Sequence, residues 1–254
     1  MTDLRLAFGT ALTAATMQGF AFCKPHGYGG DYEIIDNMYR CHISPDPAFA
    51  NWDQYYHWGA AAKAVRNRKT YFHQRLDRAS SCRSRLRVLK IASGPGRSMF
   101  EWLSANPNAP VTFQCVEIDP DAIRYAAELN HQFLDRITFT QKNALRYRPT
   151  EQYDLIWGAG IFDYFNDKVF LSLVGRLLPA LAHDGELVLG NFSDQNPTRP
   201  YMEILHDWVL YHRSADDLRS LAQQCGAKPE CITVGSEPEG VNLFLHISKR
   251  RAGQ

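Results

Sequence analysis

The chain has 254 residues, of which 45% are hydrophobic and 22% are charged, a balance typical of a folded globular protein rather than a disordered one. Its formal net charge is +1, so no strong overall field attracts a nucleic acid, and we expect no such partner. No apolar run reaches the ~20 residues of a membrane span. The six cysteines contain no C-x-x-C pair, so we expect no metal site and a reduced, cytoplasmic setting.

The first 84 residues come before any clear strand pattern and are expected to form a helical lid. The mildly apolar stretch from Leu6 to Ala21 lacks a basic start and a clear cleavage site, so it reads as a helix rather than a signal peptide. Tyr28 lies in a flexible glycine stretch and either closes over a bound ligand or belongs to a surface turn. Arg66 opens a basic run and either faces solvent or reaches the carboxylate of a cofactor.

From residue 85 to residue 254, apolar strand runs alternate with helical patterns, which is the order of a parallel sheet with crossover helices. The expected strands are Leu86–Ile91, Val111–Ile118, Ile137–Gln141, Tyr153–Trp157, Glu186–Gly190, Cys231–Gly235 and Asn242–Ser248. The expected helices are Ser98–Ala105, Pro120–Gln132, Asp167–Ala182, Tyr201–Tyr211 and Ala215–Gln224. Only a short turn separates the last two strands, so they should be antiparallel neighbours.

The predicted fold class is therefore α/β. We expect a Rossmann-like, seven-stranded and mostly parallel sheet whose last strand is antiparallel, preceded by the helical lid. The chain then divides into residues 1–84 and residues 85–254. We expect a monomer or a homodimer.

A glycine loop follows the first predicted strand and opens a helix. Its residues Ser93, Gly94 and Gly96 let the backbone approach a ligand closely, and the helix start offers free N–H groups. Glu117 and Ile118 end the second strand, where an acidic side chain can accept both hydroxyls of a ribose. The alternatives are an ordinary tight turn and a solvated strand end.

Two further loops follow the third and fourth predicted strands. Asn143-Ala144 can meet the edge of an adenine, and the small residues Gly158-Ala159 leave room for a bulky group. Because the carboxyl ends of parallel strands share one edge of the sheet, all four loops should meet at one crevice. The glycine loop is not G-x-G-x-x-G, no Gly-Lys-Ser/Thr follows it, and the chain has no G-x-S-x-G elbow, which argues against dinucleotide, P-loop and α/β-hydrolase chemistry.

Several segments resemble the motifs of class I S-adenosylmethionine-dependent methyltransferases. These segments are VLKIASGPGR, VEIDPDAI, QKNALRY and LLPALAHDGELVLGNF. A narrower resemblance, to bacterial methyltransferases of 3-hydroxypalmitic acid methyl ester biosynthesis, rests on residues 24–39, 64–72, 159–170, 190–213 and 240–245. Many such methyltransferases carry an acidic residue where this chain has Lys90 and a glycine where it has Ala92.

The resemblance implies methyl transfer from S-adenosyl-L-methionine, with S-adenosyl-L-homocysteine as product, to a small-molecule acceptor. A hydroxy fatty acid or another carboxylic acid, in quorum sensing or secondary metabolism, is slightly favoured over a hydroxyl or nitrogen of a heteroaromatic natural product. The rival interpretations are a nicotinamide-dependent oxidoreductase and a non-catalytic binding module with the same fold.

The acceptor side is sought after the fourth and fifth predicted strands. Phe162 and Tyr164 are candidates for the wall of an acceptor pocket, or else Phe162 is a core residue at the start of a helix. Asn191 and Tyr201 lie on either side of Arg199, which can pair with an anionic acceptor or face solvent.

Two residues are candidates for direct participation in catalysis, namely Tyr28 and His206. His206 and its neighbour Asp207 point in different directions on a helix, so they do not form a catalytic pair. His206 alone can act as a base.

Overall fold

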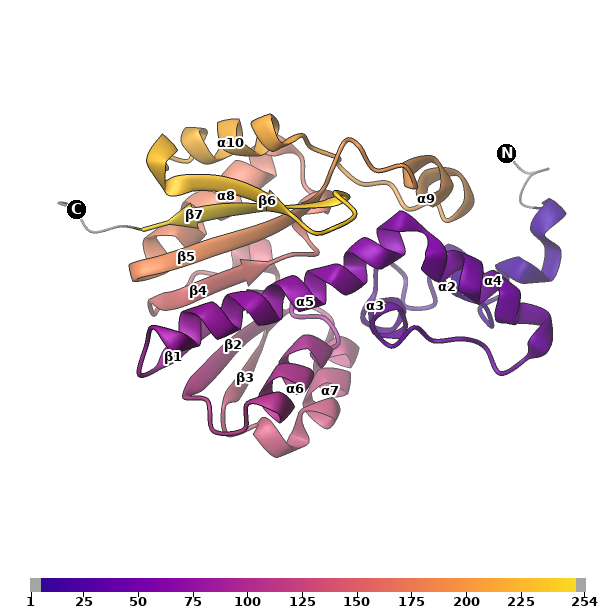
Figure 1. Cartoon of the computed structure of the whole chain (residues 1–254), viewed down its shortest axis with the longest axis horizontal. Coiled ribbons are helices and arrows are strands. Elements are labelled where there is room, and N and C mark those ends of the chain that lie inside the picture. The colour runs from indigo at the N-terminus through magenta and orange to yellow at the C-terminus, as the bar shows by residue number, and fades with distance from the viewer. Residues whose placement is uncertain (1–5, 250–254) are drawn as a thin grey trace.

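The computed structural model describes residues 6–249, which form a seven-stranded sheet with helices on both faces (Figure 1). The strands are β1 (Leu86–Ile91), β2 (Val111–Glu117), β3 (Ile137–Gln141), β4 (Tyr153–Gly158), β5 (Leu181–Phe192), β6 (Ile232–Ser236) and β7 (Asn242–Ser248). Their order is β3-β2-β1-β4-β5-β7-β6, and β7 is antiparallel to both of its neighbours. This confirms the predicted fold class. Residues 1–5 and 250–254 of the two predicted parts lie outside the described residues.

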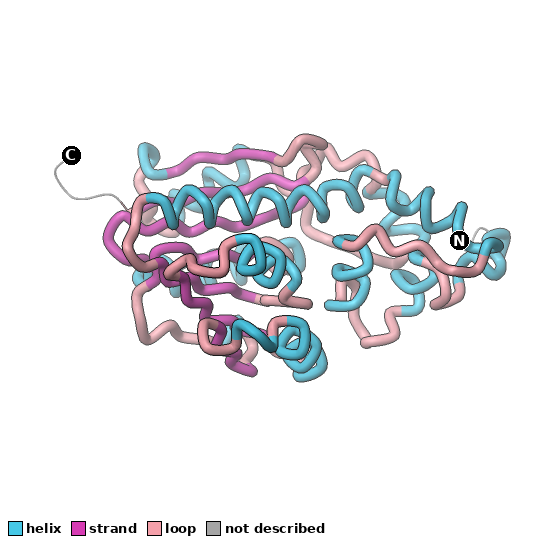
Figure 2. The backbone as a smooth tube through the Cα atoms, turned by 60° about the horizontal axis from the view of Figure 1, so that its bottom comes forward, coloured by secondary structure: helices cyan, strands magenta, loops and turns pink. Residues whose placement is uncertain are grey.

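The helices cover both faces of the sheet and one of its ends (Figures 1 and 2). They are α2 (Met17–Cys23), α3 (Tyr32–Tyr39), α4 (Pro47–Trp58), α5 (Ala60–Ser81), α6 (Arg97–Ala105), α7 (Pro120–Leu129), α8 (Asp167–Leu177), α9 (Arg199–Leu205) and α10 (Ala215–Gln224). The long helix α5 buries Phe72 and Leu76 in one cluster with β1 and β2, so its second half is part of the core of the sheet.

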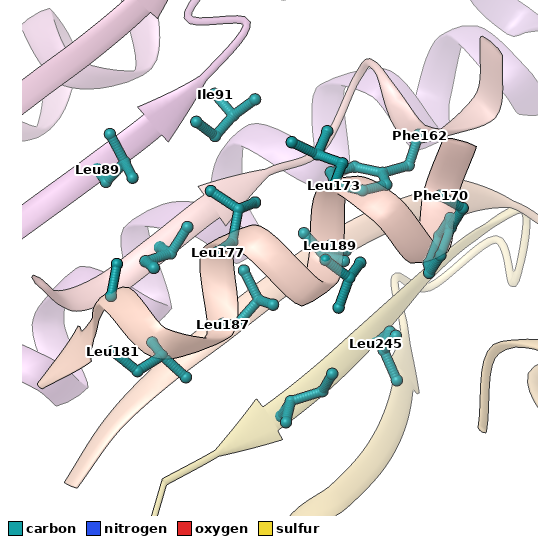
Figure 3. Close-up of a cluster of buried hydrophobic side chains, with 14 of the residues drawn as sticks. Leu89, Ile91, Phe162, Phe170, Leu173, Leu177, Leu181, Leu187, Leu189 and Leu245 are labelled. Carbon is teal, nitrogen blue, oxygen red and sulfur yellow. The ribbon is translucent and has the colours of Figure 1, made fainter. Parts of the chain in front are cut away.

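The opposite face of the sheet is covered by α8 and α10. Leu173 and Leu177 of α8 pack with Leu187 and Leu189 of β5 and with Leu245 of β7 (Figure 3). Alternate residues of a strand point to opposite faces, so β1 sends Leu89 and Ile91 into this cluster and Val88 into the other. Burying both faces in this way is the usual requirement of a parallel sheet.

Helices α2, α3, α4 and α9 gather beyond one end of the sheet (Figures 1 and 2). A third buried cluster joins them, with Ile34 and Met38 of α3 and Met202 of α9 among its members. Asp36 of α3 fastens this group to the sheet domain, since it is 1% exposed and accepts hydrogen bonds from Arg97 (Nη2 to Oδ2, 2.8 Å) and from the hydroxyl of Tyr125 (2.7 Å).

Several predicted elements have different limits in the structure. The stretch read as one N-terminal helix is broken, and Thr16 caps α2 by accepting a hydrogen bond from the amide of Gly19. The helix expected over 201–211 ends at Leu205, because Asp207 adopts a left-handed conformation with φ +50°. The helix expected over Asp167–Ala182 ends at Leu177, and the strand expected over Glu186–Gly190 extends over Leu181–Phe192.

Within residues 6–249, no single helix has the length and apolar composition that crossing a membrane requires. One pair of helical segments, Leu6–Leu12 and Met17–Cys23, meets the criterion jointly, with a bend of 101° between them.

Candidate functional site

A cavity of about 300 Å³ lies at the carboxyl ends of β1, β2 and β4, beneath the N-terminal helices. The predicted site residues that line it are Tyr28, Ser93, Gly94, Gly96, Glu117, Ile118, Ala159 and Tyr164. The structure thus brings together the glycine loop, the end of β2, the loop after β4 and one segment of the predicted lid.

The two glycines of the loop have different structural reasons to be glycine. Gly94 has φ +59°, and a Cβ atom added there would meet nothing within 4 Å. Gly96 has φ +75°, and its Cβ atom would lie 2.8 Å from the side-chain nitrogen of Asn130. Left-handed backbone favours glycine at both positions, but only Gly96 is also required by packing. Gly94 leaves open space beside its backbone.

Glu117 is 8% exposed and lines the cavity. Its carboxylate accepts hydrogen bonds from the amide of Gly94 (3.0 Å) and from its neighbour Ile118 (2.8 Å). The amide of Asp119 also donates to this carboxylate (3.3 Å). Three of its about four lone-pair sites are therefore occupied, and one further donor can still bind. Tyr28 reaches across from the N-terminal segment and donates its hydroxyl to Asp119 (2.7 Å). Burial, this hydrogen bond and the nearby carboxylates raise the pKa of Tyr28.

Two buried cations, Lys90 and Arg68, also line the cavity. The ammonium of Lys90 donates to the hydroxyl of Ser98 (2.9 Å) and stands 4.8 Å from the ring centre of Phe72. Burial lowers the pKa of Lys90 to about 8. Arg68 donates to the carbonyl of Ala159 (2.5 Å). Within residues 6–249, neither cation forms an ion pair, so both are available to an anionic group of a ligand.

Asp163 and Tyr164, in the short helical turn after β4, close another side of the cavity. Asp163 accepts a hydrogen bond from the amide of Phe192 (2.5 Å), and burial raises its pKa to about 6. The hydroxyl of Tyr164 donates to the carbonyl of Gly29 (2.7 Å) and accepts from the indole of Trp208 (2.8 Å). Tyr164 therefore connects the loop after β4 to the N-terminal segment, through Gly29, and to the segment after α9, through Trp208.

Several predicted cofactor residues lie away from the cavity lining. Arg66 donates to the carbonyl of His57 (2.7 Å), whereas Arg68, two positions later, reaches the cavity. Asn143 accepts a hydrogen bond from the amide of Leu145 (2.8 Å) and so caps the turn Ala144–Arg146.

The neighbours of these residues belong to the core. Ala144 packs in the cluster beneath α8. Gly158 abuts Phe162, since a Cβ atom added to it would lie 2.9 Å from that ring.

The residues predicted on the acceptor side are also dispersed. Phe162 points into the core cluster and is fully buried there (Figure 3). Asn191 accepts a hydrogen bond from the buried guanidinium of Arg213 (2.8 Å) and does not line the cavity. Arg199 is paired with Glu203 four residues later on α9 (2.7 Å). Tyr201 and His206 line a second cavity, of about 400 Å³, between α4, α5 and α9.

Several residues of the first cavity are not among the predicted site residues, and Lys90, Arg68, Asp163 and Trp208 are four of them. The sequence prediction names Arg66 rather than Arg68, names Phe162 and Tyr164 but not Asp163 between them, and places Trp208 within a helix. A signal for Arg68 was present, because it shares a spacing of four residues with the buried Ala64, Phe72 and Leu76, which places it on the inward face of α5.

Known proteins are similar to this chain in fold and, over part of its length, in sequence. Residues 88–185 match the family model of a methyltransferase domain. No curated protein matches the chain.

Solved structures similar to this chain come from several bacteria. A possible exported protein from Bordetella parapertussis is 19% identical with a TM-score of 0.72, over 87% of this chain and 80% of its own. Magnesium protoporphyrin IX methyltransferase from Synechocystis PCC 6803, with bound S-adenosylhomocysteine, is 12% identical with a TM-score of 0.57, over 74% and 86%. The 1,6-didemethyltoxoflavin-N1-methyltransferase from Burkholderia thailandensis, with its acceptor and S-adenosylhomocysteine bound, is 17% identical with a TM-score of 0.54, over 74% and 79%.

At these identities the solved structures show a similarity of fold only. The family match is a similarity of sequence, and it covers the central segment of the chain. The sheet order β3-β2-β1-β4-β5-β7-β6 and the glycine loop after β1 agree with both. The chain therefore has the class I methyltransferase fold, and its residues 88–185 match the model of a methyltransferase domain.

Proposed function

We propose that the protein is an S-adenosylmethionine-dependent methyltransferase that acts on a small organic acceptor. The observation that carries the proposal is the composition of the first cavity. An open glycine backbone, one carboxylate at the end of β2 and two buried cations without ion-pair partners meet there. The methyltransferase family match of residues 88–185 and the two similar structures that hold S-adenosylhomocysteine support the same assignment.

The residues of the cavity fit the parts of this donor. Glu117 is placed to accept a ribose hydroxyl, as the acidic residue at this strand end does in nucleotide-binding folds. Lys90 and Arg68 are suited to the donor's carboxylate, because each is buried and forms no ion pair among the described residues. Glu117 interacts with Lys90, and Asp163 with Arg68, from beyond ion-pair distance. Gly94, beside open space, lets the backbone approach the ligand closely.

When bound, the donor supplies an electrophilic methyl carbon on a sulfonium. The acceptor's nucleophilic atom forms a bond to that carbon, the S–C bond breaks with its electron pair moving to sulfur, and a proton on the acceptor must leave. The chain's own contribution is alignment and exclusion of water. Trp157, Tyr164 and Trp208 line the cavity and would shield the reacting atoms.

Asp163 is the residue we propose to take the acceptor's proton where one must leave. It lines the cavity and, with a pKa of about 6, is mostly ionised at neutral pH but still basic enough to be useful. The raised pKa of Tyr28 keeps its hydroxyl protonated at neutral pH, so it has no free site to take a proton, and we assign it a role in closing the site. His206 does not line this cavity, and we assign it a role in binding the acceptor rather than in proton transfer.

Calorimetric titration with S-adenosylhomocysteine tests the proposal. We expect the wild-type protein to bind it, and Glu117→Gln to weaken binding by at least about tenfold, because hydrogen bonds to a charged acceptor contribute ~1.5–3 kcal/mol. Glu128→Gln, on the exposed side of α7, is the matched control and should bind as the wild type does. Preferential binding of NAD would contradict the proposal and favour an oxidoreductase.

A further inference from the structure

The second cavity has an aromatic wall and lies against the first. Its volume is about 400 Å³, and its lining comes from α4, the start of α5, α9 and the segment that follows α9. The ring of Tyr55 meets the ring of Tyr201 edge-on at 5.8 Å and lies 6.4 Å from that of Trp58. Val65, Phe192 and Trp208 line both cavities, so these three side chains form the wall between them.

Two side chains of this cavity have buried polar atoms without a hydrogen-bond partner among the described residues, namely the hydroxyl of Tyr201 and the imidazole of His206. His206 has two such atoms. It is 1% exposed, and neither of its ring nitrogens has a hydrogen-bond partner within residues 6–249. The rings of Tyr201 and Tyr56 hold it at centroid distances of 4.7 and 5.6 Å. A buried polar group without a hydrogen bond is costly, so a ligand that pairs with this imidazole recovers that cost.

The surroundings of His206 favour an uncharged ligand. Burial lowers its pKa to about 3, so the imidazole stays neutral at physiological pH and offers one donor and one acceptor. Lys63 is the one cation among the described lining residues, and its ammonium stands over the ring of Trp58 (5.5 Å). A carboxylate that entered this cavity would lose its hydration, and no buried positive charge would offset that cost.

We propose that this second cavity binds the body of the methyl acceptor, and that the acceptor is an uncharged, largely aromatic molecule anchored by a hydrogen bond to His206. Its nucleophilic atom would pass the wall formed by Val65, Phe192 and Trp208 to reach the first cavity. That the ligand is a methyl acceptor rests on the proposed function. That the second cavity binds such a ligand does not, because neither this cavity nor His206 depends on a bound methyl donor.

Three naphthalene probes test the chemistry of the cavity by calorimetry with the full-length protein at pH 7. 2-Naphthol is neutral and carries a hydrogen-bonding group, naphthalene carries none, and 2-naphthoate is ionised. We expect 2-naphthol to bind about tenfold more tightly than naphthalene, the worth of one good hydrogen bond, and 2-naphthoate to bind most weakly. No detectable binding of 2-naphthol, or 2-naphthoate binding as tightly as 2-naphthol, would overturn the proposal.

Substitution of His206 tests where the probe lies. His206→Phe keeps the size of the ring and should abolish the advantage of 2-naphthol over naphthalene, whereas His183→Phe, in an exposed part of β5, should leave it intact. An unchanged advantage in His206→Phe refutes the assignment. If His206→Phe does not fold, nitrogen-15 resonances of the wild-type histidines give the answer, since 2-naphthol must shift those of His206.

Addition of S-adenosylhomocysteine separates this inference from the proposed function. If both hold, 2-naphthol binds equally well with and without the cofactor product, because the two ligands occupy adjacent cavities. Displacement of 2-naphthol by S-adenosylhomocysteine would place the probe in the first cavity and overturn the inference alone. Lack of S-adenosylhomocysteine binding, with His206-dependent naphthol binding intact, would instead refute the proposed function.

Discussion

Lys90 is an unusual residue at the end of the central strand. Its ammonium is buried, with one hydroxyl acceptor and no ion pair among the described residues, so the folded protein bears a desolvation cost that the unfolded chain does not. That cost makes sense if the charge serves a ligand. Such a residue marks a functional site more strongly than a solvated surface lysine does.

The cost of burying Lys90 gives stability a pH dependence of known sign. The folded pKa is about 8 and the ordinary value is 10.5, so between these values the unfolded chain binds more protons and stability rises with pH. We expect the free energy of unfolding of the wild type, measured against Lys90→Met, to increase by up to ~3 kcal/mol from pH 7.5 to pH 10. Urea denaturation at both pH values measures it.

The control for this comparison is Lys142→Met, which removes a lysine from an exposed position. It corrects for the loss of a lysine as such. A wild-type-minus-Lys90→Met difference that stays constant, or falls, across this pH range would contradict the buried-charge account.

Glu117 and Gly94 could be predicted from the sequence because the carboxyl ends of parallel strands lie at the ligand edge of the sheet. This rule does not select the cavity residues by itself, since Asn143, which it places after β3, caps a turn away from the cavity. The choice between Arg66 and Arg68 could not rest on such a rule. Two positions on a helix differ by ~200° of rotation, so one faces the cavity and the other faces away, and only the phase of the helix decides which.

At the scale of the element, helix α3 depends on one carboxylate. Asp36 accepts hydrogen bonds from Arg97 of α6 and Tyr125 of α7, and Arg40 lies 3.9 Å away. These contacts hold the helices α2, α3 and α4 with their connecting segments, which we call the N-terminal layer, over the glycine loop, because α6 begins directly after that loop. The ring of Tyr32 adds a contact with Tyr125, at 5.3 Å between centroids.

Asp36→Asn tests how much this junction stabilises the fold. The asparagine keeps the size of the side chain but leaves the guanidinium of Arg97 without its carboxylate, and breaking a buried pair on one side is strongly destabilising. We expect the free energy of unfolding in urea to fall by about 2–3 kcal/mol.

The matched control is Asp121→Asn, whose ion pair with Arg124 (2.8 Å) is largely exposed. Exposed pairs contribute little, so its loss should be at most ~1 kcal/mol. Equal losses for the two variants would show that Asp36 does not fasten the layer.

The end of helix α9 could not be predicted from the spacing of apolar residues. Its apolar residues continue past Leu205 at a plausible helical spacing, which predicted a helix to Tyr211. In the structure Trp208 turns back to donate to Tyr164, and the left-handed Asp207 allows that turn. A hydrogen bond between residues so far apart in sequence is a tertiary contact, which local propensity does not encode.

For the molecule as a whole, the N-terminal layer and the sheet share one cavity. Tyr28, Tyr32, Ile35 and Tyr39 line it from the layer, and Glu117 lines it from β2. The sequence predicted the sheet well because each strand and crossover helix has a local pattern. It did not show that α5 belongs to both parts, with its second half in the core of the sheet and its first half in the third cluster.

A ligand that bridges the layer and the sheet must stabilise the layer against opening. S-Adenosylhomocysteine at about 100 times its dissociation constant adds ~2.7 kcal/mol to any opening that destroys its site. We expect hydrogen exchange of amides in residues 26–40 to slow by up to ~100-fold, since they exchange through that opening. Amides of α10, which lines neither cavity, should slow much less when they exchange through local fluctuations.

Glu117→Gln provides the control within the same experiment, because at equal ligand concentration its weaker binding should reduce the protection of residues 26–40. Equal slowing in α10 and in residues 26–40 would mean that the ligand stabilises the fold globally and that the layer does not open by itself. Protection confined to the loops after β1 and β2 would mean that the ligand binds the sheet alone. Only selective protection of residues 26–40 agrees with a covering layer that closes on the ligand through contacts such as the hydrogen bond from Tyr28 to Asp119.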